Sequence, residues 1–327
     1  MVADRPPLAS ELFGSRYDKY VGLHPTCGAL VAHLRQLADT TNLEAELDRI
    51  QADEAPTSPL RRRQVTSLRY YLRDLLVEAA GFESYAPAQT NYHLLLEQLL
   101  LWQEKSRDPI ALVTFNYDTM VEKAIRDLTG RQLLTVDEYV EDEQLRLFKP
   151  HGSANWGRVM VNARGGLGGD GQSVERAAVE FAGNGTLELT NDYVVCDTRS
   201  IALSGDRLLL PALTVPIQRK QDFEFPASHL ERLRTSLQSG PGPTKVLTIG
   251  WRAGEENFLK FWCDNPGASQ PRLLTVNGYL DRSLGAVEKL RSSGFRISEA
   301  KGLDGGFSHL IGSPLTDFLE ARFGSYA

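Results

Sequence analysis

Four short apolar runs constrain the fold of this chain more than any other feature. They occupy residues 110–115, 245–250, 272–277 and 295–300, with the sequences IALVTF, KVLTIG, RLLTVN and FRISEA. Three of the four are followed by segments whose apolar residues recur at helical spacing. Short apolar strands that alternate with helices are typical of parallel sheets with crossover helices. The sequence therefore predicts an α/β protein in which the four runs lie in one mainly parallel sheet.

The segments outside these runs predict how the chain is organised. Residues 1–107 carry apolar side chains at helical spacing with turn residues between them, which indicates a mostly helical block. Residues 159–243 alternate loosely among glycines and polar residues, which indicates a β-rich insertion and a connecting helix. Residues 108–158 and 244–327 then form the α/β core, and we expect a single domain of 327 residues.

Polar residues and glycines follow the predicted strands at their carboxyl ends. Asn116, Tyr117 and Asp118 come directly after the first run, the second run ends at Gly250 and the third at Asn277. Ligands of open α/β sheets bind beyond these strand ends, and a glycine lets the backbone approach a ligand closely. We therefore expect these residues to border one crevice.

The segment LFKPHGSANW adds a histidine to this set. His151 follows a short apolar approach, and Gly152 and Ser153 predict a tight turn. Each residue also has a structural alternative: Asp118 suits a helix cap, His151 suits a turn, and Trp251 suits a core or pocket wall.

A glycine cluster between residues 165 and 171 has two interpretations. Its sequence, GGLGGDG, satisfies the G-x-G-x-x-G pattern that cradles dinucleotide phosphates. A flexible loop between a strand and a helix also explains it, and the density of glycines favours the loop.

Composition excludes several classes of protein. The net charge of -6 and a pI near 5.6 supply no basic field for a phosphate backbone, so nucleic-acid binding is not expected. Cys27, Cys196 and Cys263 form no C-x-x-C pair, which argues against a zinc knuckle and a disulfide framework. No apolar run is long enough to span a membrane, and the first residues lack the apolar core of a signal peptide. These features favour a cytoplasmic protein.

A set of ordered motifs resembles one known family. In chain order the motifs are TFNYD, KPHGSANW, VPIQRKQDFEFP, LTIGWRAGEENFLKF, TVNG and GGFSHLI. Together they resemble the SIR2-like family, in the branch of bacterial antiphage NADases, over about residues 7–323. The resemblance implies a Rossmann-like core, with NAD bound at the strand ends as the substrate and no metal.

The resemblance also implies roles for individual residues. Asn116 matches the residue beside the nicotinamide ribose, Asp118 the residue that helps to hold the nicotinamide amide, and His151 the residue near the ribose hydroxyls. Thr114 and Tyr117 belong to the first of these motifs and are implied to contact the cofactor.

Later motifs imply further contacts with NAD. Gly250 and Trp251 match a turn that contacts ribose and phosphate, and Asn277 matches the position that meets the adenosine ribose. Phe307, in GGFSHLI, is also expected to contact NAD.

The chain departs from the family in two respects. The four zinc cysteines of protein-deacylating sirtuins are missing, and residues 159–216 offer no substitute, so no zinc module is expected. Family members also begin with an apolar strand and a G-A-G-x-S phosphate loop, whereas this sequence opens at MVADRPPLASELFG. Either the true start lies upstream or that strand and loop are lost.

The expected activity is hydrolysis of NAD to nicotinamide and ADP-ribose, in antiphage defence by NAD depletion. An amide such as Asn116 can orient a water, and a neutral imidazole such as His151 can remove a proton near neutral pH. The alternative is a catalytically impaired SIR2-fold module that binds nucleotides or a partner chain. An NAD-dependent deacylase is disfavoured because the zinc cysteines are missing. A homo-oligomer or an operon-encoded partner protein is left open.

Overall fold

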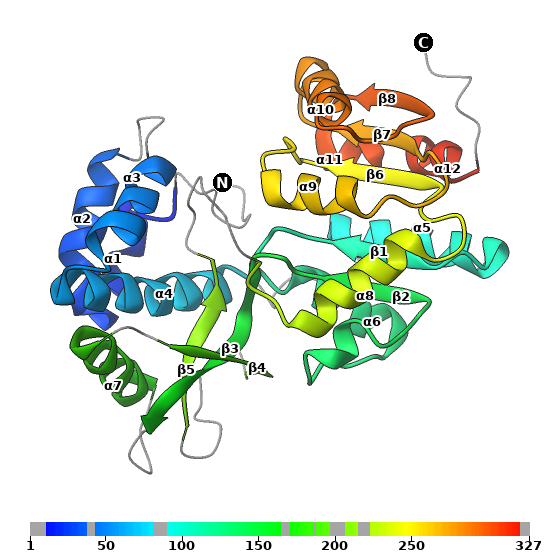
Figure 1. Ribbon diagram of the computed structural model, residues 1–327. Helices are drawn as coiled ribbons and strands as arrows, with labels where there is room; N and C mark the ends of the chain where they lie inside the picture. The colour runs from blue at the N-terminus through cyan, green and yellow to red at the C-terminus, as the bar shows by residue number, and fades with distance from the viewer. Residues whose placement is uncertain are drawn as a thin grey trace.

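The computed structural model describes residues 11–37, 43–80, 90–164, 171–185, 188–196, 207–214 and 223–320. It is a mixed α/β structure with parallel sheets, as the sequence predicts. Figure 1 shows two halves: helices and an antiparallel sheet in one, parallel strands with flanking helices in the other.

The first half begins with a helical block. Its helices are α1 (Asp18–Leu23), α2 (Gly28–Leu37), α3 (Leu43–Arg49) and α4 (Pro59–Ala80), with short 3₁₀ turns at Ser15–Tyr17 and Pro25–Cys27 and a π-helical turn at Ile50–Glu54. Pro59 is the first residue of α4. The amide of a first helical residue has no partner within the helix, so a proline, which lacks the amide hydrogen, loses no hydrogen bond there. Leu30, Leu34, Leu68 and Tyr71 are fully buried between these helices. The helical pattern in the sequence reflects this shared core.

An antiparallel sheet packs beside α4. It contains β3 (Gly152–Arg164), β4 (Leu189–Val195) and β5 (Arg207–Leu213), with β3 in the centre. Helix α7 (Gly171–Asn184) lies against α4, and α8 (Ala227–Gln238) leads from this region back to the second half. These elements have the β-rich character that the sequence predicts for residues 159–243.

The second half contains two parallel sheets. Helix α5 (Asn91–Ser106) leads to β1 (Ile110–Val113), which pairs with β2 (Leu145–Phe148) across α6 (Met120–Thr129). Strands β6 (Lys245–Ile249), β7 (Arg272–Val276) and β8 (Glu299–Leu303) form the other sheet in this order, with α9 (Glu256–Asp264) and α10 (Leu280–Ser292) as crossovers. The chain then continues into α11 (Gly306–Leu310) and α12 (Ser313–Leu319).

The expectation of one sheet is therefore wrong. Among the described strands, β1 bonds β2 alone and β6 bonds β7 alone, although β6 lies beside the β1–β2 pair in Figure 1. One apolar core still serves both sheets, because Ile110, Leu147, Leu274 and Val276 belong to the same cluster of buried side chains. No strand in the ranges that the structure describes bridges β1 and β6, so the sheets share a core without sharing a ladder.

The fourth predicted strand begins later than expected. The sequence predicts it over residues 295–300, whereas β8 begins at Glu299. Phe295 is buried and stacks on Trp262, with ring centroids 4.8 Å apart. Its apolar side chain therefore fills the core ahead of the strand, which explains why the apolar run is out of register with β8.

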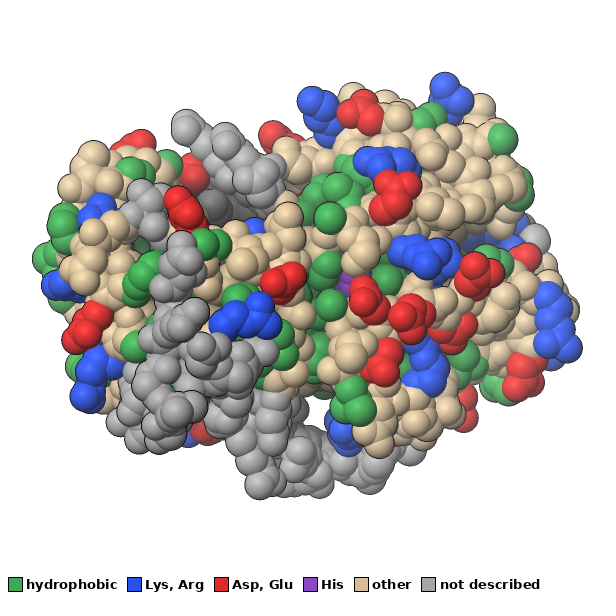
Figure 2. All heavy atoms as spheres, turned by 60° about the horizontal axis from the view of Figure 1, so that its bottom comes forward, with side chains coloured by type: hydrophobic (Ala, Val, Ile, Leu, Met, Phe, Trp, Pro, Cys, Tyr) green, Lys and Arg blue, Asp and Glu red, His purple; other side chains and the backbone are tan. Residues whose placement is uncertain are grey.

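Several other expectations concern the surface or residues outside the described ranges. The glycine cluster at residues 165–170 and most of the VPIQRKQDFEFP motif lie outside the described residues. No helix among those that are described is both long and apolar enough to cross a membrane. Figure 2 shows acidic and basic side chains interspersed over the face that it draws, so neither sign dominates what is described of that face.

Candidate functional site

The loop after β1 carries the first predicted site residues. The Thr114 amide donates to the Phe148 carbonyl at 3.0 Å, which extends the β1–β2 ladder by one bond. The Thr114 hydroxyl accepts a hydrogen bond from the Asn116 amide at 3.1 Å, so the chain turns at this point. Asn116 is exposed, and its side-chain Nδ2 donates to the Tyr92 hydroxyl at 3.1 Å. Asn116 thus projects beyond the strand end while Tyr92 orients its amide.

His151 lies next to this loop. Its side chain is buried, and Nδ1 donates to the Phe115 carbonyl at 3.2 Å. A carbonyl only accepts, so Nδ1 carries a proton, and in the neutral imidazole Nε2 is then the proton acceptor, as a general base requires. The ring packs against Phe115 at 4.9 Å and Tyr117 at 6.1 Å between centroids. His151 is therefore held by the residues on both sides of Asn116.

Glycine is required at position 152 for a structural reason that the sequence interpretation missed. Its φ is +82°, and an added Cβ would lie 1.9 Å from the Ala212 carbonyl oxygen of β5. The glycine therefore permits a close approach of two strands, whereas the sequence suggested approach to a ligand. The turn still fixes His151, because the Thr214 amide donates to the His151 carbonyl at 3.0 Å.

Asp118 lies one residue before Thr119, the N-cap of α6, which makes no side-chain cap bond itself. The Asp118 carboxylate Oδ1 accepts from the Met120 amide, the first amide of α6, at 3.0 Å. The side chain is 5% exposed. Asp118 therefore bonds the start of the helix, but from the position before the N-cap that the capping alternative assigned to it, and this bond orients its carboxylate at the strand end.

Gly250 and Trp251 bring the second sheet to the same place. Gly250 has a φ of +67°, and no atom lies within 4 Å of an added Cβ, so the left-handed backbone is its only evident requirement. Trp251 stacks on Phe115 with ring centroids 5.6 Å apart, and its Nε1 donates to the Glu255 carboxylate. The carboxyl ends of β1 and β6 therefore meet through an aromatic contact.

Asn277 ends β7 with an unsatisfied side chain. Its backbone is engaged on both sides, because its amide donates to Leu303 and its carbonyl accepts from Gly306. The side chain is 6% exposed, and its Nδ2 has no hydrogen-bond partner. A buried amide donor without a partner is uncommon, and a polar ligand atom or a water at this position would satisfy it.

Phe307 connects Asn277 to the Asn116 loop. It lies in α11, directly after Gly306, and its ring meets Tyr92 edge-on at 5.3 Å between centroids. Burial, with the nearby charge of Asp118, raises the pKa of Tyr92 above its usual range, so its hydroxyl stays protonated. The hydroxyl can therefore donate to an acceptor while it accepts from Asn116.

Three residues of the candidate site were not identified from the sequence. Tyr92 lies in the first turn of α5 and has no motif to mark it. Lys149 and Glu122 form a buried ion pair of 2.7 Å beneath the Asn116 loop. A lysine directly before the PHG turn, at the end of a buried strand, was the one signal that could have singled out Lys149.

The arrangement fits a polar, extended ligand with groups that accept hydrogen bonds. Exposed Asn116, the imidazole of His151 and the unsatisfied amide of Asn277 lie on loops that the Phe307 and Trp251 contacts join. Such a set can orient a water or hydroxyl, remove a proton and bind a ribose or amide oxygen. In the described ranges, no group of three or more His, Cys, Asp or Glu side chains is placed to hold a metal ion.

Comparisons with known proteins add no family assignment. No protein-family model matches the chain. A search of curated proteins finds no match either.

Proposed function

We propose that this chain is an NAD hydrolase that cleaves the bond between nicotinamide and ribose. The observation that supports the proposal most is the hydrogen bond of 3.2 Å from His151 Nδ1 to the Phe115 carbonyl. It fixes the imidazole next to the Asn116 loop, at the carboxyl ends of parallel strands, with Nδ1 as the donor, so Nε2 of the neutral ring is the proton acceptor. The resemblance of the ordered motifs to the SIR2-like family is consistent with this placement and suggests a Rossmann-like core.

Each residue of the site has a separate role in such a reaction. Positive charge develops on the ribose as nicotinamide leaves, so groups fixed before the reaction stabilise the transition state without reorganising. Asn116 orients the attacking water through its amide, and His151 accepts a proton through Nε2. Asp118, held by the Met120 amide, and the backbone around it contact the departing carboxamide. Asn277 donates to an oxygen of the adenosine half, which satisfies its buried amide.

Nicotinamide release from NAD by the purified protein is the direct test. Asn116→Ala and His151→Ala should each lower turnover by about 10²-fold or more, the scale of a positioned acid–base group. The double variant should be little worse than either single one, because residues that act as a unit lose their effect together.

Matched controls separate chemistry from folding. Asn191→Ala changes an exposed asparagine of β4, and His33→Gln changes a histidine of the helical block; both should keep turnover near wild type. Wild-type turnover in folded Asn116→Ala and His151→Ala would contradict the proposed site. NAD binding without nicotinamide release would favour a binding module instead.

A role in antiphage defence is part of the same proposal. NAD hydrolysis in the cell would deplete a cofactor that phage replication and the host both require. The test is to measure cellular NAD after infection of cells that express the wild type or His151→Ala. Equal NAD levels in both, with active purified enzyme, would contradict the defence role and leave the activity intact.

A further inference from the structure

A fully buried lysine lies under the proposed site. The side chain of Lys149 is 0% exposed, and its Nζ is 2.7 Å from Glu122 Oε1 in the first turn of α6. The same ammonium donates to the Asp118 backbone carbonyl. An uncompensated buried charge destabilises a fold by several kcal/mol, so a buried lysine needs both of these acceptors.

The loop after β1 is fastened to the segment after β2 at three successive points. The Phe115 carbonyl accepts from His151 Nδ1 at 3.2 Å, and the Tyr117 carbonyl accepts from the Ala154 amide at 2.8 Å. The Asp118 carbonyl accepts from Lys149. All three donors belong to residues 149–154, so the position of Asn116 relative to His151 depends on this set of bonds.

Lys149 differs from the other two donors because it also binds beyond the loop. Its second acceptor, Glu122, belongs to the helix that continues from the loop, and Glu122 Oε1 also lies 3.4 Å from the Ser153 and Tyr139 hydroxyls. One ammonium therefore joins the loop, the helix that follows it and the segment that leads from β2 to His151. A charged hydrogen bond in a buried site is stronger than a neutral one.

We propose that Lys149 is a positioning residue that sets the Asn116 loop against His151. Its effect on turnover rests on the proposed NAD hydrolysis, whereas its effect on the loop does not. The ammonium restrains the Asp118 carbonyl, and with it the turn that presents Asn116. When Lys149 is lost, the loop and the histidine move independently, and the geometry of the reacting groups is lost with them.

A pair of substitutions separates positioning from stability. Lys149→Met alone leaves the Glu122 carboxylate without its cation, so it should destabilise the fold. Replacing a buried ion pair by apolar side chains of similar size is often neutral, so the double variant Lys149→Met/Glu122→Leu should recover most of the stability. The Asp118 carbonyl still lacks its donor in that double variant.

Amide hydrogen exchange of residues 114–120, measured without substrate, is the deciding readout. In the double variant these amides should exchange at least about tenfold faster than in the wild type. Glu122→Gln removes the counter-charge of Lys149 and should destabilise the fold, but it keeps the bond from Lys149 to Asp118, so exchange of the loop relative to the rest of the chain should stay close to the wild type. Lys123→Met, a neighbouring lysine that pairs with Asp127 on the surface, is the matched control and should change nothing in the loop.

The outcomes are distinct. Wild-type exchange in a stable double variant would overturn the proposal, as would loop exchange in Glu122→Gln as fast as in the double variant. Where the wild type cleaves NAD, the double variant should lose at least about tenfold in kcat with a smaller change in KM. A wild type that releases no nicotinamide would overturn the proposed function, and the exchange rates would still decide the role of Lys149.

Discussion

At Gly152 the absence of a side chain lets two strands meet. The φ of +82° costs any other residue about 1–2 kcal/mol, and a Cβ at this position would overlap the Ala212 carbonyl as well. Gly250 needs only its left-handed backbone, because no atom lies within 4 Å of its added Cβ. The two glycines of the predicted site are therefore required for different reasons.

Alanine at these two positions should separate the two requirements. Gly152→Ala should lower the free energy of unfolding by about 3 kcal/mol or more, because backbone must move to relieve the overlap. Gly250→Ala should lower it by about 1 kcal/mol. Urea unfolding of both variants measures the difference, and equal losses would show that the β3–β5 approach at Gly152 is not tight.

His24 is a second residue with a measurable effect on stability. Its Nδ1 is 2.6 Å from Glu175 of α7, and its Nε2 is 3.0 Å from Asp74 of α4. Burial lowers its pKa, but the hydrogen bonds to Asp74 and Glu175 outweigh burial and raise the pKa to about 9. The charged imidazole thus joins α7 to the helical block.

The pH dependence of stability follows from this raised pKa. The contribution of His24 is complete below its unfolded pKa of 6.5 and is lost as the pH rises through about 9. A shift of this size corresponds to about 3 kcal/mol. We expect the free energy of unfolding to fall between these pH values in the wild type and much less in His24→Gln. Parallel curves for the two proteins would contradict the assignment, and His33→Gln serves as the histidine control.

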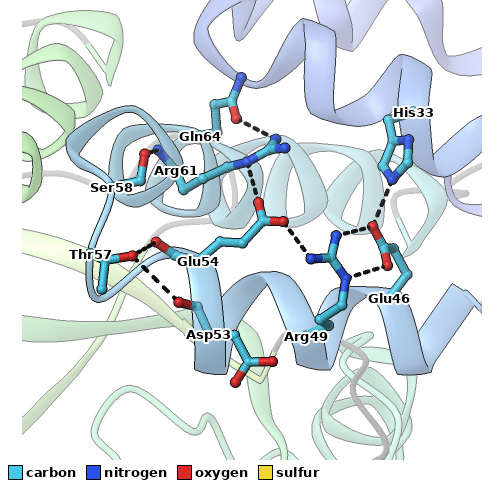
Figure 3. Close-up of polar contacts among 9 residues, drawn as sticks. All are labelled: His33, Glu46, Arg49, Asp53, Glu54, Thr57, Ser58, Arg61 and Gln64. Carbon is cyan, nitrogen blue, oxygen red and sulfur yellow. Dashed lines mark hydrogen bonds and ion pairs between the residues drawn. The ribbon is translucent and has the colours of Figure 1, made fainter.

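Among the elements, the helical block depends on a chain of charges as well as on its core. Figure 3 shows Arg49 between Glu46 and Glu54, with Arg61 on the far side of Glu54. His33 of α2 also contacts Glu46 at 2.7 Å. These contacts connect α2, α3, the π-helical turn and α4, which are consecutive elements of the block.

Acid should weaken this network through Glu46. The hydrogen bond from Arg49, supported by that from His33, lowers the pKa of Glu46 from 4.5 to about 2 against the opposing effect of burial. Its contribution is present above pH 4.5 and is lost as the pH falls toward 2. Because Arg49 is 48% exposed, solvent limits the contribution to about 1 kcal/mol.

Acid titration of a variant checks this contribution. Glu46→Gln should lose about 1 kcal/mol of stability near neutral pH and show a flatter acid limb in chemical unfolding. Glu97→Gln, on the exposed face of α5, should leave both unchanged. An acid limb that is as steep in Glu46→Gln as in the wild type would assign the loss to other carboxylates.

For the whole molecule, the division between the two parallel sheets is the main finding. The Ile110 amide donates to Gln144 and the Thr114 amide to Phe148, so the Leu112 amide faces β2 and those of Ala111 and Val113 face away. By the same alternation Thr248 faces β7 and Leu247 faces away, since the Gly250 amide bonds Val276. Strands β1 and β6 are also less buried than β2 and β7.

Hydrogen exchange by NMR should reproduce this alternation. Leu112 and Thr248 should exchange at least about tenfold more slowly than Val113 and Leu247, because only the former donate within a ladder. Strand β7 has partners on both sides and should be protected evenly, so it is the internal control. Even protection along β1 and β6 would mean that their outer edges are paired in solution.

The sequence by itself determined the features that depend on near neighbours. Three strands of the parallel sheets, the helices before and after them and the bond of Asp118 to the start of α6 were all readable from spacing along the chain. Periodic burial and capping involve residues a few positions apart, so the pattern carries their structure directly. The same local logic placed Asn116, Gly250 and Asn277 at strand ends.

Only the tertiary structure decided which of these elements meet. Strand β2 was not predicted as a strand, because its four residues include Arg146 and give too short an apolar signal. Among the described strands it is nevertheless the one that pairs with β1. The partners of Lys149 and Asn116 are likewise distant in sequence, at Glu122 and Tyr92. Strand pairing and the compensation of a buried charge depend on which surfaces the folded core brings together, and spacing along one chain does not encode that choice.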